Sequence, residues 1–377
     1  MNIRRYGALL AGGLVFLLAG CRPSAPPPIP SDLDTRLEEL AEAFFANGDF
    51  SGIVAISRDG ELLGTSTVGS PDSDPANSHD LHTSFHIASI SKTFTAVAIR
   101  SLAERDALSL DAPLSSLLPG FPEGERLTIR HLLDHRSGIP DYWSLPDVRE
   151  VMARKLAVGE IVDWLGSHSL EFEPGSDFSY SNSGYTVLAA VIEAASGQPY
   201  HDYLAARVYP AAALTETGAF RNDTDTVEFS PAYGPGRIEP SPTYDPSILV
   251  GAGSLRSTAG DLLSWCEAFN ADFLNPGTAT FVHGWGVRSE NGRRRVEQTG
   301  RNPGFSSHLR AYPDSRTCVV VLSNIESDSV AALGAGASSI VFGEPVTPPA
   351  RRTVIPVPED KLVDYVGRFE ISEGREL

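Results

Sequence analysis

The sequence predicts a mixed α/β (α+β) fold in which a central antiparallel sheet is flanked by helices and joined to a mostly helical subdomain. Two β-rich regions, near residue 52 and after residue 281, enclose long stretches in which apolar residues recur at helical spacing. Residues 110–250 are loop-rich and mostly helical, with many prolines and glycines. We therefore expect strands from both ends of the chain to form one sheet, with a site between this sheet and the helical subdomain.

The first elements can be assigned in chain order. Leucine, alanine and phenylalanine recur at helical spacing over Leu33–Phe45, which predicts a helix. Two β-rich runs follow in FSGIVAISRDGELLGTSTVG, joined by Asp59–Gly60, a strong hairpin signal. TFTAVAIRSLAERDAL and YTVLAAVIEAASG have helical periodicity, and the second ends at Gly197. A further helix is expected in LRSTAGDLLSWCEAF, capped by Ser257 or Thr258.

The chain after residue 281 is dominated by strand signals. The runs FVHGWGVR, RRVEQTG, SSHLRAYP and TCVVVLSN are separated by turn sequences, which predicts an antiparallel meander, and DSVAALGAGASSIVFG predicts a closing helix against the sheet. The basic run Arg293–Arg295 is interpreted as a solvated face. Cys266 and Cys318 occur in apolar helical and strand-like contexts. These contexts favour two buried thiols over a disulfide, although an exported compartment would permit one.

The N-terminus has the features of an export signal. MNIRR is basic, and GALLAGGLVFLLAG is an apolar run too short for a stable membrane span, so residues 1–20 are predicted to be a signal peptide. LAGC resembles a bacterial lipoprotein processing site, which implies lipidation of Cys21; ordinary secretory cleavage is the alternative. We expect an exported, membrane-anchored lipoprotein on the periplasmic or extracellular face. A proline-rich linker over 21–32, a main domain over 33–345 and a tail over 346–377 complete the organisation.

Charge and histidine placement argue against two classes of ligand. The formal net charge of −18 repels phosphate backbones, so nucleic acid is not expected as a partner. His79, His82 and His86 lack a partner cluster, and no metal or other cofactor is expected. His131 and His135 lie four residues apart and are interpreted as structural hydrogen-bonding groups.

The stretch HIASISKTFTA places Ser89 three residues before Lys92, in a chain with only three lysines. On a helix, residues at this spacing share a face, one turn apart. A lysine whose pKa is lowered by burial can take the proton of a serine hydroxyl. The pair therefore predicts a nucleophile and its base, whereas an N-cap serine followed by a solvated lysine is the alternative.

Two further stretches carry polar groups that such a nucleophile needs. FSYSNSGYTVLAAVIE places Tyr180 and Asn182 directly before a helix. A phenol near an ammonium ionises more easily and can move protons, and an asparagine can orient an amide. EQTGRNPGFSS places Thr299 and Gly300 on a strand. A glycine there lets a substrate lie along the strand edge, where backbone N–H groups can bind an oxyanion.

Ser-x-x-Lys, Tyr-x-Asn and Thr-Gly in this order resemble the serine β-lactamase and penicillin-binding protein family, in particular class C β-lactamases, D,D-carboxypeptidases and their esterase relatives. FHIASISKTFTA, IRHLLDHRSGIPDY, GAGSLRSTAGDL and GWGV match as well. The resemblance implies a β-lactamase/transpeptidase-like serine hydrolase domain over 33–345 that needs no cofactor. It also implies that Ser89 is the acyl-forming nucleophile and that Lys92 and Tyr180 share proton transfer, with Tyr180 favoured as the general base.

The same resemblance implies the substrate-binding groups. Asn182 would contact the substrate amide, the Thr299–Gly300 strand would hold the substrate, and the backbone N–H groups of Ser89 and Arg301 would form the oxyanion hole. The third motif of the family usually begins with lysine or histidine, but Gln298 stands here and cannot form a charged pair. Either Gln298 still donates a hydrogen bond, or the guanidinium of Arg301 supplies the missing charge.

The expected function is that of an exported serine hydrolase that cleaves an amide or ester bond through an acyl-Ser89 intermediate. Its substrates would be small molecules or peptides, such as D-amino-acid peptides, β-lactams or small esters. A carboxylesterase acting on neutral esters is one alternative, and Gln298 favours it. A non-catalytic, penicillin-binding-like sensor protein is the other, and the presence of Lys92, Tyr180 and Asn182 beside the serine argues against it.

Overall fold

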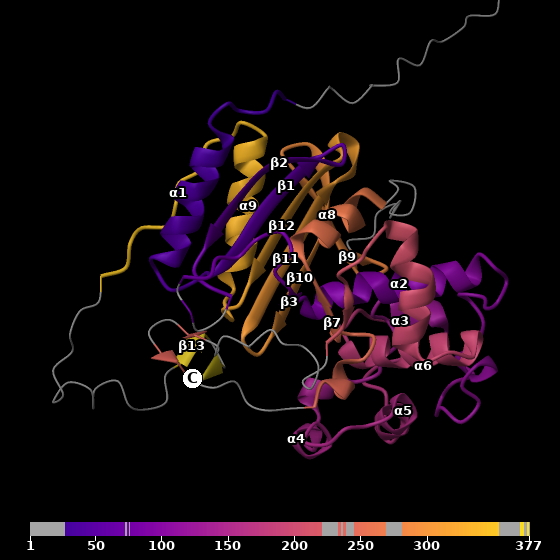
Figure 1. Cartoon of the computed structure of the whole chain (residues 1–377). Helices are drawn as coiled ribbons and strands as arrows, with labels where there is room; N and C mark the ends of the chain where they lie inside the picture. The colour runs from indigo at the N-terminus through magenta and orange to yellow at the C-terminus, as the bar shows by residue number, and fades with distance from the viewer. Residues whose placement is uncertain are drawn as a thin grey trace, which may run out of the picture.

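A seven-stranded antiparallel sheet with strand order β2-β1-β12-β11-β10-β9-β8 forms the body of the molecule (Figure 1). The structure is a computed structural model, and it describes residues 27–71, 74, 76–220, 233–234, 237–238, 245–268, 281–353, 370–372 and 375–376. The strands of this sheet are β1 (Gly52–Arg58), β2 (Glu61–Val68), β8 (Phe281–Val282), β9 (Trp285–Glu290), β10 (Arg293–Asn302), β11 (Phe305–Tyr312) and β12 (Thr317–Ser323).

Strands from the two ends of the chain meet in this sheet, as predicted. β1 pairs with β2 across the Asp59–Gly60 turn and, on its other side, with β12, in a register that places Gly52 opposite Ser323. The sheet continues from β12 as a meander through β11, β10 and β9. In the β9–β10 turn, Gly292 has a φ of 78°, which side chains disfavour, so a glycine suits the turn. The predicted fold class, an antiparallel sheet flanked by helices, is confirmed.

Helices cover both faces of the sheet because β1 is apolar on both. Val54 and Ile56 point to the face covered by α1 and α9, which lie side by side in Figure 1. The alternate residues, Ile53 and Ala55, point to the opposite face, where α8 packs. The described helices are α1 (Leu33–Phe45), α2 (Ser91–Ala103), α3 (Ile129–Leu133), α4 (Val148–Val151), α5 (Val158–Gly166), α6 (Asn182–Ser196), α7 (Tyr200–Tyr203), α8 (Ala259–Ala268) and α9 (Ser329–Val341).

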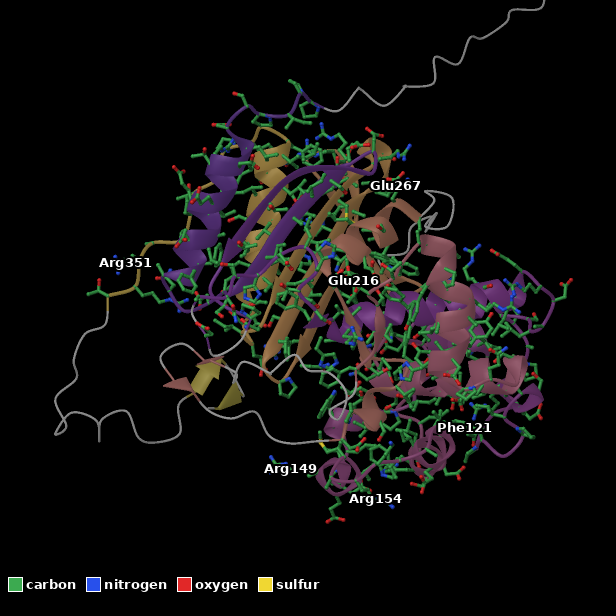
Figure 2. The ribbon with its side chains drawn as sticks, in the orientation of Figure 1. Phe121, Arg149, Arg154, Glu216, Glu267 and Arg351 are labelled. Carbon is green, nitrogen blue, oxygen red and sulfur yellow. A yellow bond between two sulfur atoms is a disulfide. The ribbon has the colours of Figure 1, made fainter. Side chains whose placement is uncertain are left out.

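The helical part of the molecule holds α2 to α7 and lies beside the sheet (Figure 1). Figure 2 labels Phe121 on this part. Helix α6 ends as predicted, with Gly197 in the left-handed region at φ 70°. Helix α8 begins after Thr258, whose hydroxyl oxygen accepts the backbone N–H of Asp261 at 3.2 Å, so Thr258 is the cap. A second, three-stranded sheet, in the order β3 (Phe85–His86), β7 (Leu255–Ser257) and β4 (Gly218–Ala219), leads into the segment that carries Ser89.

Cys266 and Cys318 form a disulfide, so the expectation of two separate thiols is wrong. Helix α8 packs against β12, which brings the two Cα atoms to 6.2 Å, within the range that a disulfide spans. Sequence periodicity predicts apolar surroundings for each cysteine, but it does not indicate that the helix and the strand that carry them lie in contact. The bond closes a separation of 52 residues and ties the helix to the sheet.

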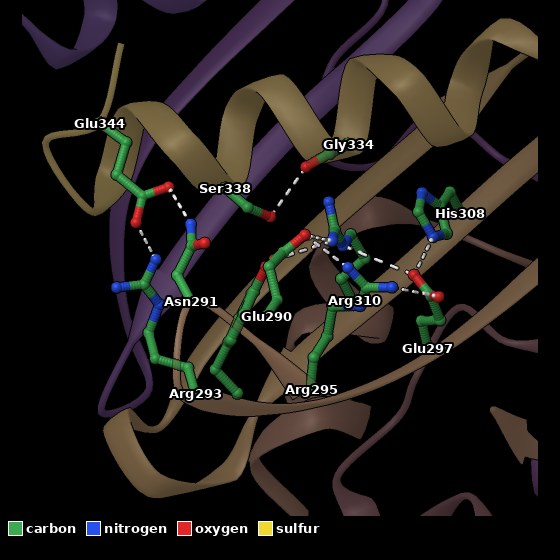
Figure 3. A network of polar contacts seen from close by, with 11 residues as sticks. Glu290, Asn291, Arg293, Arg295, Glu297, His308, Arg310, Gly334, Ser338 and Glu344 are labelled. Carbon is green, nitrogen blue, oxygen red and sulfur yellow. Dashed lines mark hydrogen bonds and ion pairs between the residues drawn. The ribbon is translucent and has the colours of Figure 1, made fainter. Parts of the chain in front are cut away.

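The basic run Arg293–Arg295 was expected to be a solvated face, and this expectation is wrong. Arg293 pairs with Glu344, and Arg295 donates to Glu290 at 2.5 Å and to Glu297 at 2.7 Å. These groups belong to a network beneath α9 (Figure 3). The network forms because Arg293–Arg295 start β10 directly after Glu290, which ends β9, while Glu297 lies further along β10 and Glu344 follows α9.

The two ends of the chain lie largely outside the described residues. The predicted signal peptide (1–20) and Cys21 are outside them, and the domain boundaries remain predictions. Of the tail, Arg352 donates to both carboxylate oxygens of Asp49, and β13 (Glu370–Ser372) pairs with β14 (Arg375–Glu376). Among the residues that the structure describes, no helix is both long and apolar enough to cross a membrane.

Candidate active site

Ser89 lies in a tight turn directly before α2. The turn is a 3₁₀ segment, Ala88–Ile90, and α2 begins at Ser91. The N–H of Ile87 donates to the carbonyl of Leu255 at 3.0 Å, which ties the start of the turn to β7. Ala88 has a φ of 46°, in the left-handed region that L-residues other than glycine seldom adopt. Such strain is typical of functional sites, where surrounding structure holds a side chain in place.

Lys92 is fully buried, and its ammonium faces three oxygen atoms. Nζ lies 3.2 Å from the Oγ of Ser89, 2.7 Å from the Oδ1 of Asn182 and 2.8 Å from the carbonyl oxygen of Ala252. All three partners are uncharged. Burial therefore lowers the pKa of Lys92 from 10.5 to about 7, and the charge of Asp141 opposes the shift only in part.

Tyr180 completes the surroundings of Ser89. Its side chain is 38% exposed, but its hydroxyl hydrogen-bonds with the side chains of Ser89 and Gln298. Burial of this end raises the pKa of Tyr180 above its usual value, and the two hydrogen bonds only reduce the effect. No lowering of this pKa by the neighbouring ammonium outweighs the burial, and the role of Tyr180 in proton transfer stays a prediction. Lys92 Nζ lies 4.9 Å from the centre of the Tyr180 ring, where the π-face attracts it.

Strand β10 packs against the turn Ala88–Ile90 that carries Ser89, and Gln298 and Gly300 make this contact. The amide of Gln298 donates to the backbone carbonyl of Ser89 at 3.2 Å. A Cβ placed on Gly300 would lie 2.3 Å from the carbonyl oxygen of Ile87, so only glycine permits this approach. Strand β9 pairs with β10 only as far as Glu297, so among the described strands the outer edge beyond that residue is free to hold a substrate.

Thr299 and Arg301 point the other way. Residues alternate across a strand, so these two side chains lie on the face opposite Gln298, and both are exposed. The guanidinium of Arg301 donates to Asp328 at 2.8 Å and lies 3.7 Å from Glu326. The structure thus does not bring the Arg301 side chain to the Ser89 group. The hypothesis that this guanidinium replaces the missing lysine is not supported, whereas the backbone of Arg301 stays on the edge beside Gly300.

The remaining histidines have structural surroundings. His131 and Thr128 form a reciprocal cap at the start of α3. The ring of His86 is buried and stacks on Phe220, with centroids 4.1 Å apart, and His82 pairs with Glu216 at 3.0 Å. Within the described part of the chain, no three His, Cys, Asp or Glu side chains are grouped so that they could hold a metal ion.

In the loop before η3 (Tyr142–Ser144), sequence reasoning took His135 for a structural group without placing it beside Tyr180, and it missed Asp141. The ring of His135 packs against Tyr180 with centroids 4.5 Å apart, and its Nδ1 accepts the N–H of Ser181 at 3.1 Å. Asp141 accepts two hydrogen bonds from Asn182. Both residues occur in HRSGIPDY, but an acid before an aromatic residue in a loop is usually a local cap, and periodicity cannot place it beside a distant helix.

Comparison with known proteins agrees with this geometry. The family model described as Beta-lactamase matches residues 37–338. The chain is 30% identical to penicillin-binding protein 4* of Bacillus subtilis, over 90% of this chain and 83% of the relative, and 29% identical to esterase EstB of Burkholderia gladioli, over 75% and 81%. A solved penicillin-binding protein from Bacillus halodurans superposes with a TM-score of 0.68 at 27% identity, covering 81% of this chain and 98% of that one. The chain therefore belongs to the Beta-lactamase family and is a serine hydrolase.

Proposed function

We propose that the protein cleaves an ester or amide bond of a small-molecule or peptide substrate through an acyl-Ser89 intermediate. The observation that carries this proposal is the 3.2 Å separation of Ser89 Oγ from the fully buried Nζ of Lys92. With a pKa of about 7, a large share of Lys92 is neutral at neutral pH. A neutral amine donates two hydrogen bonds, which Asn182 Oδ1 and the Ala252 carbonyl accept, and its lone pair is left for the serine proton.

The reaction then follows from these positions. Ser89 Oγ attacks the acyl carbon while its proton moves to Lys92 Nζ, and the bond to the leaving group breaks. The leaving group takes a proton from Lys92 directly, or from Tyr180, which then regains one from Lys92. Water then hydrolyses the acyl ester and restores Ser89. The lowered pKa of Lys92 favours this residue as the base. The family resemblance favoured Tyr180 as the base, and the share of Tyr180 in proton transfer stays a prediction.

Within this chemistry, neutral ester substrates are the second candidate, and a specific observation favours them. A substrate carboxylate needs a nearby cation, but Gln298 is neutral and the Arg301 guanidinium pairs with Asp328. Of the large aromatic side chains, Trp143 and Phe178 are exposed on the two segments that carry Asp141 and Asn182. Exposed aromatic groups on the segments that carry Asp141 and Asn182 suit apolar acyl groups.

The proposal includes export and anchoring through Cys21. The Cys266–Cys318 disulfide supports it, because disulfides persist mainly in oxidising compartments outside the cytoplasm. Expression in bacteria fed radiolabelled palmitate tests the anchor. Label should appear in wild type and in the membrane fraction, and should be absent from Cys21→Ala. Equal labelling of both proteins would contradict lipidation at this residue.

Intact-protein mass spectrometry tests the chemistry. Wild type and Ser89→Ala are each treated with a penicillin and, separately, with an activated short-chain ester. Turnover of the ester that requires Ser89, without a penicillin adduct, supports the neutral-ester candidate. A stable penicilloyl adduct that requires Ser89 supports a D,D-peptidase-like or β-lactamase-like activity. If neither reagent reacts, the catalytic proposal fails and the sensor alternative gains support.

A matched variant sharpens this test. Gln298→Lys places a cation where the family usually has one, so it should raise penicilloyl formation relative to ester turnover. Ser289→Lys, at an exposed position of the neighbouring strand β9, adds the same charge away from the site and serves as the control. An equal response of the two variants would mean that the neutral Gln298 does not govern substrate choice.

A further inference from the structure

We propose that Asp141 is a positioning residue of this site, which fixes the orientation of the Asn182 side-chain amide. In that orientation the amide oxygen faces Lys92, and one amide N–H stays available to a substrate carbonyl. The inference rests on the proposed acyl transfer at Ser89 and adds a residue to its machinery.

Three donors hold the Asp141 carboxylate. Its Oδ2 accepts the backbone N–H of Asn182 at 2.6 Å and the side-chain Nδ2 of Asn182 at 2.8 Å, and its Oδ1 accepts the N–H of Trp143 at 2.9 Å. Asn182 is the first residue of α6, so the carboxylate also lies at a helix N-terminus, where negative charge is stabilised. The Asp141 carboxylate is therefore fixed on both sides.

The chemistry of the partners then allows one amide orientation. An asparagine amide has an oxygen that accepts and a nitrogen that donates, and the two ends exchange places when the group turns over. A carboxylate only accepts, so the Asp141 end must be the nitrogen. The Lys92 ammonium only donates, so its end must be the oxygen, at 2.7 Å. Without Asp141, a neutral Lys92 could face either end of the amide, and the serine base would lose a fixed partner.

Asp141 also provides the one carboxylate whose charge raises the pKa of Lys92 against the effect of burial. The other titratable groups around Lys92 are Tyr180 and Tyr185, whose rings lie 4.9 Å and 5.7 Å from Nζ, and His135. Burial keeps both phenols protonated and the imidazole neutral. A change at Asp141 is therefore expected to act on Lys92 directly as well as through Asn182.

The experiment separates the two effects by pH. Ser89 acylation by an activated ester is measured as kcat/KM from pH 5 to 9.5 in wild type, Asp141→Asn and the control Asp147→Asn. Asp147 accepts from Trp164 at 2.8 Å, away from Asn182, so its variant removes a comparable acid from the same helical part. The high-pH plateau, where Lys92 is neutral in each protein, reports amide orientation. The midpoint of the acid limb reports the charge state of Lys92.

We expect Asp141→Asn to lower the plateau about 10- to 100-fold, the range for losing one hydrogen bond to a charged group. Its midpoint should fall below the wild-type value near pH 7, because the variant loses a charge that favours the ammonium. Asp147→Asn should match wild type. In an Asn182→Ala background, Asp141→Asn should add little further loss of plateau, because the amide that it orients is gone. An unchanged plateau, or an equal loss in both backgrounds, overturns the inference.

Failure of the proposed function is detected separately, because wild type would then not react with the ester. The inference is then judged on exchange of the Asn182 side-chain amide hydrogens, followed by NMR with Asn182→Ala for assignment. A hydrogen held by a carboxylate is protected, so exchange should quicken at least tenfold in Asp141→Asn and not in Asp147→Asn. Equal exchange in all three proteins overturns the inference.

Discussion

The molecule buries cationic side chains on both faces of its sheet, and the two faces differ in the charge of the groups around the cation. On the Ser89 side, Lys92 is 0% exposed and meets only neutral oxygen atoms. Beneath α9, Arg310 is 1% exposed, donates to both oxygens of Glu290 at 2.8 Å and 3.0 Å, and lies 3.6 Å from Glu297 (Figure 3). The first cation lacks an adjacent counter-charge, and the second is surrounded by carboxylates.

This difference decides what each group can do. Burial lowers the pKa of Lys92 to about 7, which makes it a base. On the other face, burial alone would raise the pKa of Glu297, but the hydrogen bond from His308 and the charges of Arg295 and Arg310 outweigh it and lower this pKa to about 2. Buried charge that is well paired keeps its charge and serves the fold, whereas buried charge with neutral partners becomes reactive at neutral pH.

The largest effects on activity and on unfolding free energy are expected when each cation is replaced by a neutral side chain of similar length. Lys92→Met should lower Ser89 acylation by about 10²- to 10⁴-fold, the usual contribution of a positioned base. Its unfolding free energy in urea should not decrease, because the variant removes a buried charge without a carboxylate partner. A clear loss of stability in Lys92→Met would mean that this cation serves the fold after all.

The opposite outcome is expected for Arg310→Met. It leaves Glu290 and Glu297 with fewer partners, so the unfolding free energy should fall by about 3 kcal/mol, the lower end for breaking a buried ion pair because Arg295 still faces both carboxylates. Arg294→Met is the matched control. Arg294 pairs with Asp314 near the surface, so its loss should cost about 1 kcal/mol or less. Similar losses in the two variants would show that the network beneath α9 does not stabilise the fold.

The smallest effect is the pH dependence of stability, which should rise with pH on both faces but in different pH intervals. Folded Lys92 loses its proton near pH 7 and unfolded lysine near 10.5, so the unfolded state holds more protons in this interval and stability rises with pH across it. Lys92→Met should remove this rise. Folded Glu297 has the lower pKa, so its contribution is present above about pH 4.5 and is lost as the pH falls towards 2.

Urea unfolding at a series of pH values checks both pH intervals. Lys92→Met is the variant for the interval above pH 7, and Glu297→Gln is the variant for the interval below about pH 4.5. The acid limb of the stability curve should be flatter in Glu297→Gln than in wild type, and the interval between pH 7 and 10.5 should be flatter in Lys92→Met. If either variant gave a curve parallel to that of wild type, the corresponding pKa shift would not contribute to stability.

The sequence predicted the elements that depend on local pattern. Alternation and turn residues placed the hairpin at Asp59–Gly60, the late meander and the end of α6 at Gly197. Helical spacing also brought Ser89 and Lys92 onto one turn. These features follow from neighbouring residues, so a single sequence contains them.

What the sequence did not reveal depends on contacts between distant residues. The disulfide needed the packing of α8 on β12, and the direction of the Arg301 side chain needed the register of β10. The Arg293–Arg295 run looked solvated because two of its acidic partners, Glu290 on β9 and Glu344 after α9, lie outside the strand that carries the arginines. The raised pKa of Tyr180 could not be predicted from an adjacent ammonium alone, because desolvation, which a sequence does not display, is the larger influence.

The pairing of β1 with β12 has a consequence for the order in which the protein is made. The ladder joins residues 52–58 to residues 317–323, so roughly 260 residues must be synthesised between its two halves. Contacts of such long sequence separation form slowly, and here they require the far strand to have left the ribosome. Ser89 likewise meets Gln298 only after β10 exists. Ser89 is therefore synthesised long before the strands that complete its site. The nascent chain is expected to become active only when the sheet closes, late in translation.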